Sequence, residues 1–140
     1  MGLRPGAFAD LPNLTNLSLK HCRLENISVE VFNISTLRYL DLSTNNFTDI
    51  PKDLFRQLSR LEVLKLDDVR YGGDWKSESC MLPKSLREFK FSNGSTKVNS
   101  SFADEELFRR CCPDMETISI QGSRFPNDDL AMFNGLHNLR

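Results

Sequence analysis

A six-residue pattern, apolar-x-x-apolar-x-apolar, recurs five times along the chain and constrains the fold more than any other feature. The copies are Leu14/Leu17/Leu19, Leu37/Leu40/Leu42, Leu61/Leu64/Leu66, Leu86/Phe89/Phe91 and Met115/Ile118/Ile120, and a sixth begins at Leu139. Successive starts lie 23, 24, 25, 29 and 24 residues apart. Spacing of this length is typical of a repeat protein in which each unit forms one turn of a solenoid.

The spacing within the pattern predicts the geometry of each turn. Its last two apolar residues are two positions apart, so on a strand they point to the same face, into the coil. A single repeat cannot bury this face, and only stacked neighbours create a continuous core. We therefore predict an α/β fold, a right-handed solenoid curved like part of a horseshoe. A parallel sheet of short strands would line its concave face, and loops or short helices its convex face.

The return half of each repeat has a weaker pattern of its own. A large apolar residue falls six positions before the next start at Phe8, Val31, Phe55 and Phe133, and another falls three before it at Leu11, Ile34, Leu58 and Leu136. Pro51 suits the first position of a short helix or turn. Ser101 and Asp104 resemble a capping box that opens a helix.

Residues 1–140 are predicted to form one solenoid segment, with repeats starting near 14, 37, 61, 86 and 115 and partial repeats at both ends. Residues 69–112 carry insertions and are irregular. No end cap, signal peptide or transmembrane segment is recognised, so we expect a piece of a longer protein. Any attachment to a membrane would come from parts outside this chain.

Residues that alternate with the apolar positions are predicted to face outward and to form columns across the sheet. The candidate binding residues on this face are Tyr39, Asp41, Val63, Lys65, Asp67, Glu88 and Lys90. Tyr39 and Val63 would lie side by side, and Asp41 beside Lys65 would form at most a weak ion pair. A polar face of mixed charge suits a protein or glycan partner, although plain solvated surface is the alternative. The net charge of −1, without a basic stripe, disfavours nucleic acid.

Neither the cysteines nor the sequence motifs of this chain indicate catalysis. The four cysteines are Cys22, Cys80, Cys111 and Cys112, and without a Cys-x-x-Cys pair a zinc site is not predicted. Cys80 and Cys112 fall in apolar places of the repeat, which suits buried thiols. The alternative is a disulfide between Cys80 and either Cys111 or Cys112. No nucleophile elbow, phosphate loop or dinucleotide fingerprint occurs, so we expect neither an enzyme nor a cofactor.

Seven of the eleven asparagines begin an Asn-x-Ser/Thr sequon: Asn13, Asn16, Asn26, Asn33, Asn46, Asn93 and Asn99. Ser and Thr occupy 20 of 140 positions, so chance would supply about one or two such sites. The excess favours passage through the secretory pathway and an extracellular or cell-surface protein. The alternative is that turns between repeats are simply rich in Asn, Ser and Thr.

Residues 37–51 read Leu-Arg-Tyr-Leu-Asp-Leu-Ser-Thr-Asn-Asn-Phe-Thr-Asp-Ile-Pro. Followed by Phe55 and Leu58, this run resembles the typical extracellular leucine-rich repeat. Typical repeats interrupted by longer, irregular ones, with many sequons, are similar to Toll-like receptor ectodomains. The resemblance implies ligand recognition in innate immunity by a glycosylated membrane receptor, and dimerisation of the full-length receptor. It assigns no ligand residue. The alternatives are a secreted or matrix leucine-rich-repeat protein that binds other matrix components, and a cytosolic leucine-rich scaffold.

Overall fold

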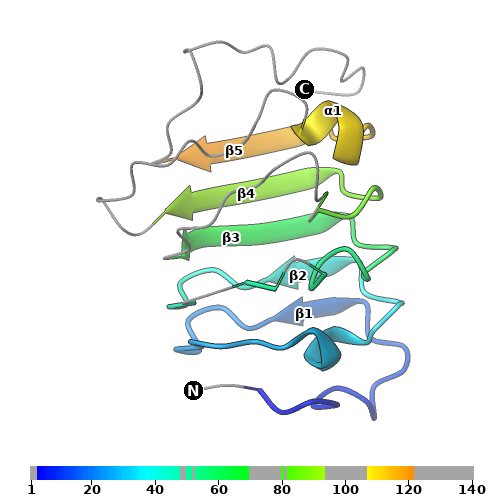
Figure 1. Cartoon of the computed structure of the whole chain (residues 1–140), viewed down its shortest axis with the longest axis vertical. Helices are drawn as coiled ribbons and strands as arrows, with labels where there is room; N and C mark the ends of the chain where they lie inside the picture. Colours follow the sequence, from blue (N-terminus) through cyan, green and yellow to red (C-terminus); the bar gives the residue numbers. More distant parts are fainter. Residues whose placement is uncertain are drawn as a thin grey trace.

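Five short strands form one parallel sheet (Figure 1). The computed structural model describes residues 3–47, 50–51, 53–69, 80, 82–93 and 107–121. The strands are β1 (Asn16–Ser18), β2 (Tyr39–Asp41), β3 (Val63–Val69), β4 (Glu88–Asn93) and β5 (Thr117–Gln121). They lie in chain order, β1-β2-β3-β4-β5. Because every strand pairs with the next one along the chain, each repeat contributes one turn of a solenoid, and the predicted fold is confirmed.

The strand pairing follows the repeat spacing. Leu17, Leu40, Leu64, Phe89 and Ile118 are successive partners across the sheet. Leu19 and Leu42 follow directly on β1 and β2, and their amides donate to the carbonyls of Asp41 at 2.8 Å and Lys65 at 2.9 Å. The apolar residues of successive motifs therefore lie side by side across the sheet, as the spacing of about two dozen residues requires.

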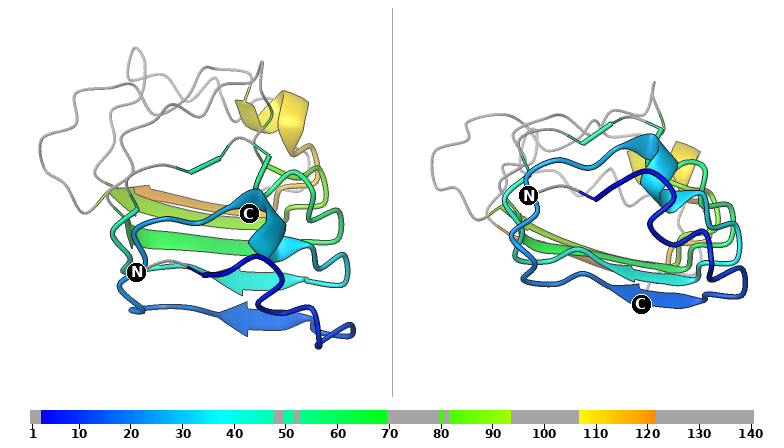
Figure 2. Two further views of the ribbon diagram at one scale, coloured as in Figure 1. Left: turned by 60° about the horizontal axis from the view of Figure 1, so that its bottom comes forward. Right: turned by 90° about the horizontal axis from the view of Figure 1, so that it is seen from below.

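The return segments cross on the opposite side of the coil from the sheet (Figure 2). They include a short 3-10 helix, η1 (Val29–Phe32), and a short α-helix, α1 (Leu107–Cys111). The segment after Pro51 forms turns over residues 53–57 rather than a helix. The capping box at Ser101 and the repeat beginning at Leu139 lie outside the described residues. No helix in the described part of the chain combines the length and the apolar character needed to cross a bilayer.

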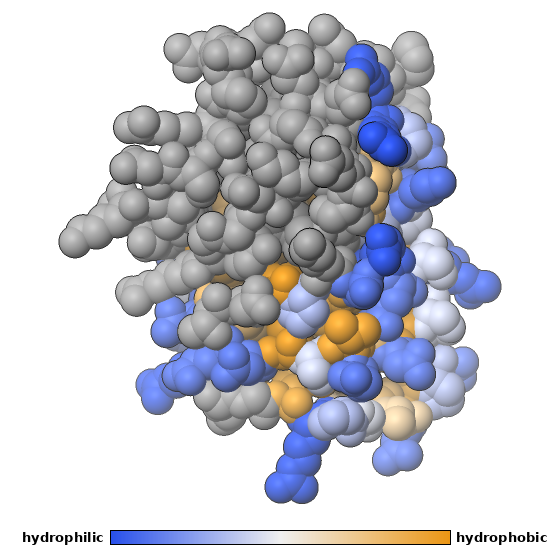
Figure 3. Space-filling model, in the orientation of Figure 1, coloured by the Kyte–Doolittle hydropathy of each residue, from blue (hydrophilic) through white to orange (hydrophobic). Residues whose placement is uncertain are grey.

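The core fills the space between the sheet and the return segments. Leu40, Leu64 and Phe89 from the sheet are fully buried, as are Phe55 and Leu58 from the return side. In the first turn the packing is looser, because β1 has only β2 as a neighbour within the described sheet. Leu14, Leu17 and Leu19 are half-buried there, and Leu11 is 49% exposed. Figure 3 views the return side and shows apolar side chains in its lower half between hydrophilic edges.

Asn45 ties successive turns together through its side chain, which is 4% exposed. Its Nδ2 donates to the carbonyls of Leu19 at 2.8 Å, Leu42 at 2.9 Å and Ser43 at 3.3 Å. Its Oδ1 accepts the amides of Leu24 at 2.9 Å and Cys22 at 3.2 Å. The backbone amides and carbonyls at which the chain leaves the sheet thereby find hydrogen-bond partners within the protein.

One repeat later the same position holds Val69, which is fully buried and has no polar side-chain atoms. The register shifts between Leu66 and Val69, so that Val69 rather than Asp68 pairs with Asn93. Extended past Asp67, the repeat spacing predicts a further column with Asp68 beside Asn93, and this prediction is wrong. An extra residue in one strand is the ordinary result of a bulge, which re-aims the side chains that follow it.

Candidate binding face

The outward columns form as the spacing predicts. Tyr39, Val63 and Glu88 are successive partners across the sheet. Asp41, Lys65 and Lys90 form the parallel column two positions further along the strands. We call the residues of these two columns, together with Asp67, the strand face. Apart from Asp41, all of its side chains are half-buried.

Lys65 is held against an aromatic ring rather than in an ion pair. Its Nζ lies 5.3 Å from the centroid of the Tyr39 ring, a cation–π geometry. Partial burial lowers the pKa of Lys65, but the neighbouring Tyr39 and the carboxylates of Glu88 and Asp41 outweigh it, so the pKa is raised. The ammonium therefore stays charged through the physiological range.

Asp41 is a weaker candidate than its place in the column suggests. The residue is only 7% exposed, and its Oδ1 accepts the amide of Ser43 at 2.9 Å. No ion pair joins it to Lys65, although the two residues are strand partners. Its carboxylate instead fixes the chain where β2 ends, so the accessible part of the strand face is centred on Tyr39, Val63, Lys65 and Lys90.

Serines beside the strand face have a structural role that the sequence does not reveal. Ser43 is 2% exposed, and its Oγ accepts the amide of Asp67 at 3.0 Å. The Ser92 Oγ accepts the amide of Asp68 at 2.6 Å. At the bulge in β3, these two hydroxyl oxygens take the place of backbone carbonyls as acceptors for the strand amides.

A row of alternating charges runs along the edge at which the strands begin, and sequence analysis missed it. Arg38 lies 3.9 Å from Glu62, Glu62 lies 4.0 Å from Arg87, and Arg87 lies 3.5 Å from Glu116, measured between nitrogen and oxygen atoms. The sequence does contain this pattern, because the four residues occupy the second position of successive repeats and their charges alternate in sign. All four side chains are 35–62% exposed, so these pairs add little to the free energy of unfolding.

Five of the sequon asparagines are accessible. Asn13, Asn16, Asn26, Asn33 and Asn46 are all exposed residues. Asn16 is the strand partner of Tyr39, so a glycan there would project beside the strand face. Asn93 lies in β4, its side chain is not described, and Asn99 lies outside the described residues.

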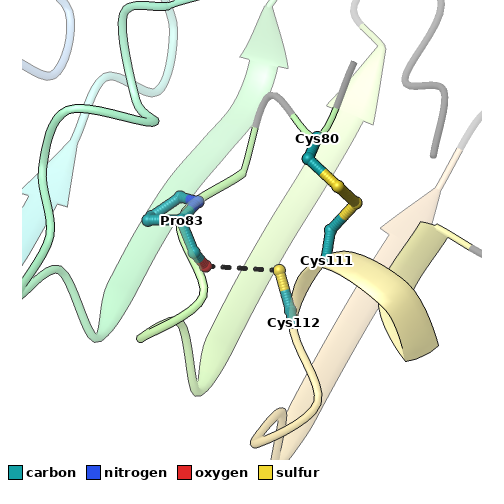
Figure 4. The surroundings of a disulfide bond; sticks show 4 residues. All are labelled: Cys80, Pro83, Cys111 and Cys112. Atoms are coloured by element: carbon teal, nitrogen blue, oxygen red, sulfur yellow. Dashed lines mark hydrogen bonds between the residues drawn. A yellow bond between two sulfur atoms is a disulfide. The ribbon is translucent and has the colours of Figure 1, made fainter. Parts of the chain in front are cut away.

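Of the two disulfide pairings left open by the sequence, the structure contains the one between Cys80 and Cys111 (Figure 4). The two Cα atoms lie 5.3 Å apart, across a sequence separation of 31 residues. Cys112 is a buried thiol that donates to the carbonyl of Pro83 at 3.4 Å. Cys22 occupies the position in its repeat that Asn45 fills in the next one. Unlike Asn45, it is exposed, and its thiol is free.

Among the residues that the structure describes, no group of three or more His, Cys, Asp or Glu side chains could hold a metal ion. The side chains that reach the surface from the sheet instead offer an array of hydrogen-bonding, charged and aromatic groups on a rigid support. Such an array can recognise a partner by complementarity.

Comparison with known proteins agrees with this architecture. Residues 12–68 match the leucine rich repeat family model. The mouse CD180 antigen is 28% identical over 98% of this chain, and mouse podocan is 44% identical over 44% of it. The chain spans only 20% of the CD180 antigen and 10% of podocan.

A solved structure of TLR13, in a complex with the RNA ssRNA13, has the same fold. The superposition covers 99% of this chain and 27% of that one, with a TM-score of 0.55 and 19% sequence identity. Fold and repeat together define a leucine-rich-repeat architecture. Within that class the chain resembles part of a Toll-like receptor ectodomain. The similarity to the CD180 antigen extends over nearly the whole length of this chain.

Proposed function

We propose that this chain is a ligand-binding segment of an extracellular leucine-rich-repeat receptor that serves Toll-like innate immune recognition. It would bind a partner and catalyse no reaction. The observation that carries the proposal is the strand face: Tyr39, Val63, Lys65 and Lys90 project from a rigid sheet and are not needed for the core. Rigid presentation lowers the entropy cost of binding.

The charges of the strand face favour a protein or glycan ligand over nucleic acid. Lys65 and Lys90 stand beside Asp67 and Glu88, so the accessible part of the face carries both signs of charge and no basic excess. The TLR13 structure contains RNA, but a nucleic-acid site requires a basic stripe, and this face has none. A partner with its own mixed charges fits better.

Exposed sequons and the disulfide support an extracellular or cell-surface location. N-glycosylation and disulfide formation both take place in the secretory pathway. In the full-length receptor, dimerisation would accompany ligand binding. A secreted or matrix protein that binds other matrix components is the second candidate. A cytosolic scaffold is the third.

A binding screen with matched lysine variants tests the proposal. The chain, secreted as a fusion to an antibody constant region, is applied to arrays of extracellular proteins, glycans and oligonucleotides. We expect a signal that falls at least tenfold with Lys65→Glu or Lys90→Glu. Lys84→Glu, an exposed lysine off the strand face, should leave it unchanged. Equal losses in all three variants, or binding to oligonucleotides alone, would refute the assignment of the face.

The location has a separate test. Treatment of the secreted protein with a glycosidase should increase its mobility on a gel. An unchanged mobility would favour the cytosolic scaffold.

A further inference from the structure

Two adjacent asparagines in the segment that follows β2, Asn45 and Asn46, have opposite environments. Asn45 is buried and its side chain makes five hydrogen bonds to backbone groups. Asn46 is exposed, its amide nitrogen in the backbone donates to the carbonyl of Leu24 at 2.9 Å, and its side chain makes no hydrogen bond to any described residue. Only Asn46 begins a sequon, with Thr48 in the third place. The backbone is thus fixed while the side-chain amide remains available.

Asn46 lines a groove of about 390 Å³ at the edge where the strands end. Three turns contribute to this strand-end groove: His21 and Arg23 from the first, Thr44 from the second and Asp68 from the third. Its volume falls in the range of about 300–1,000 Å³ that is typical of sites for small ligands. A covalently attached sugar at Asn46 would therefore begin inside a hollow of suitable size.

The backbone of this groove is held in an unusual conformation. His21, Thr44 and Asp68 have φ of 61°, 57° and 53°, in the left-handed region that residues other than glycine seldom adopt. They occupy the same place in three successive repeats. Conformations of this kind concentrate at functional sites, where the surrounding structure enforces them.

The groove offers the hydrogen-bonding groups that a sugar requires. Arg23 donates, Asp68 accepts, and His21 and Thr44 do both. Within the described part of the chain, these four side chains have no hydrogen bond or ion pair, so their capacity is unused. The hydroxyl and acetamido groups of N-acetylglucosamine match such a mixed set of donors and acceptors.

We propose that Asn46 is N-glycosylated and that the first N-acetylglucosamine of its glycan lies in the strand-end groove, where it links three turns. The donor is a lipid-diphosphate-linked oligosaccharide. The Asn46 Nδ2 forms a bond to the sugar C1 and releases a proton, the bond from C1 to the phosphate oxygen breaks, and the lipid diphosphate leaves. The inference rests on the secretory location proposed above and not on the strand face as a binding site.

The test combines site occupancy with a double-mutant cycle. The whole chain is secreted from animal cells, and occupancy at each sequon is measured by mass spectrometry. Melting temperatures are then compared for the parent, Asn46→Gln, Asp68→Ala and the double variant. We expect Asn46→Gln to lower the melting temperature by about 4 °C, the shift of roughly 1 kcal/mol in a chain of this size. In the Asp68→Ala background the shift should shrink by at least half.

Two controls separate the possible outcomes. Asn33→Gln removes an exposed sequon outside the groove and should not lower the melting temperature. Trimming the parent glycan to its first sugar should also leave the melting temperature unchanged. Occupied sequons elsewhere with Asn46 empty would overturn the inference alone, as would an occupied Asn46 whose loss has the same effect in both backgrounds. If no sequon is occupied, this inference and the secretory location both fail.

Discussion

Replacing Asn45 with alanine should be among the most destabilising single changes in the chain. The substitution removes the acceptor for the amide of Leu24, a residue only 2% exposed. An unsatisfied buried amide costs about 1–3 kcal/mol. The carbonyls of Leu19 and Leu42 also lose a donor, at roughly 1 kcal/mol each. The expected loss is therefore about 3–5 kcal/mol, a large share of the 5–15 kcal/mol that is typical of a domain.

Urea unfolding followed by circular dichroism measures this loss. With an m-value of about 2 kcal/mol/M, the midpoint should fall by roughly 2 M. Asn46→Ala is the matched control, because it truncates the neighbouring asparagine, which makes no side-chain hydrogen bond to the described residues. It should change the free energy of unfolding by less than about 0.5 kcal/mol. Both proteins should be refolded without glycans, so that Asn46 contributes no sugar. Equal midpoints for the two variants would show that Asn45 does not join the turns.

Three further predictions concern the cysteines and the charged edge. Replacing Cys80 and Cys111 together with serine should lower the free energy of unfolding by roughly 3–4 kcal/mol, because the disulfide closes a loop of about thirty residues; a loss no larger than that from Cys22→Ser would contradict this. In the native protein a thiol reagent should modify Cys22 at once and Cys112 only after unfolding, since burial raises the pKa of the Cys112 thiol from 9.0 to about 12. The folded-state pKa is the higher one, so the contribution of this thiol to stability is complete below pH 9 and declines as the pH rises toward 12, where urea midpoints should fall. Glu62→Gln should cost at most about 1 kcal/mol in low salt and less in 1 M salt; a loss that is insensitive to salt would rule out an electrostatic role for the edge.

The sheet could be predicted from the sequence because its determinants are periodic. A period of two within each motif assigns Leu40 and Leu42 to the core and Asp41 to the opposite face. Aligning equivalent positions of successive motifs, whose starts lie 23 to 29 residues apart, then fixes which residues become strand partners. Tyr39 therefore lies beside Val63, and Lys65 beside Lys90, as the spacing predicts.

Features that depend on side-chain packing could not be predicted in this way. The bulge in β3 arises where Val69 replaces the asparagine found at that position in the preceding repeat, and a periodic alignment contains no bulge. The choice of Cys111 over Cys112 depends on whether the last residue of α1 or the residue that follows it faces Cys80. The position of Lys65 over Tyr39, in place of an ion pair with Asp41, reflects a competition between contacts that spacing alone does not decide.

Blocking the strand face with a new glycan tests the central claim, that this face binds the ligand, most directly. Lys90→Asn creates a sequon with Ser92 on the strand face, and Gln57→Asn creates one with Ser59 at an exposed turn on the return side. With mass spectrometry showing that both new sites are occupied, affinity for the array ligand should fall more than tenfold in the Lys90→Asn protein and stay unchanged in the Gln57→Asn protein. Undiminished binding by the glycosylated Lys90→Asn protein would contradict the claim.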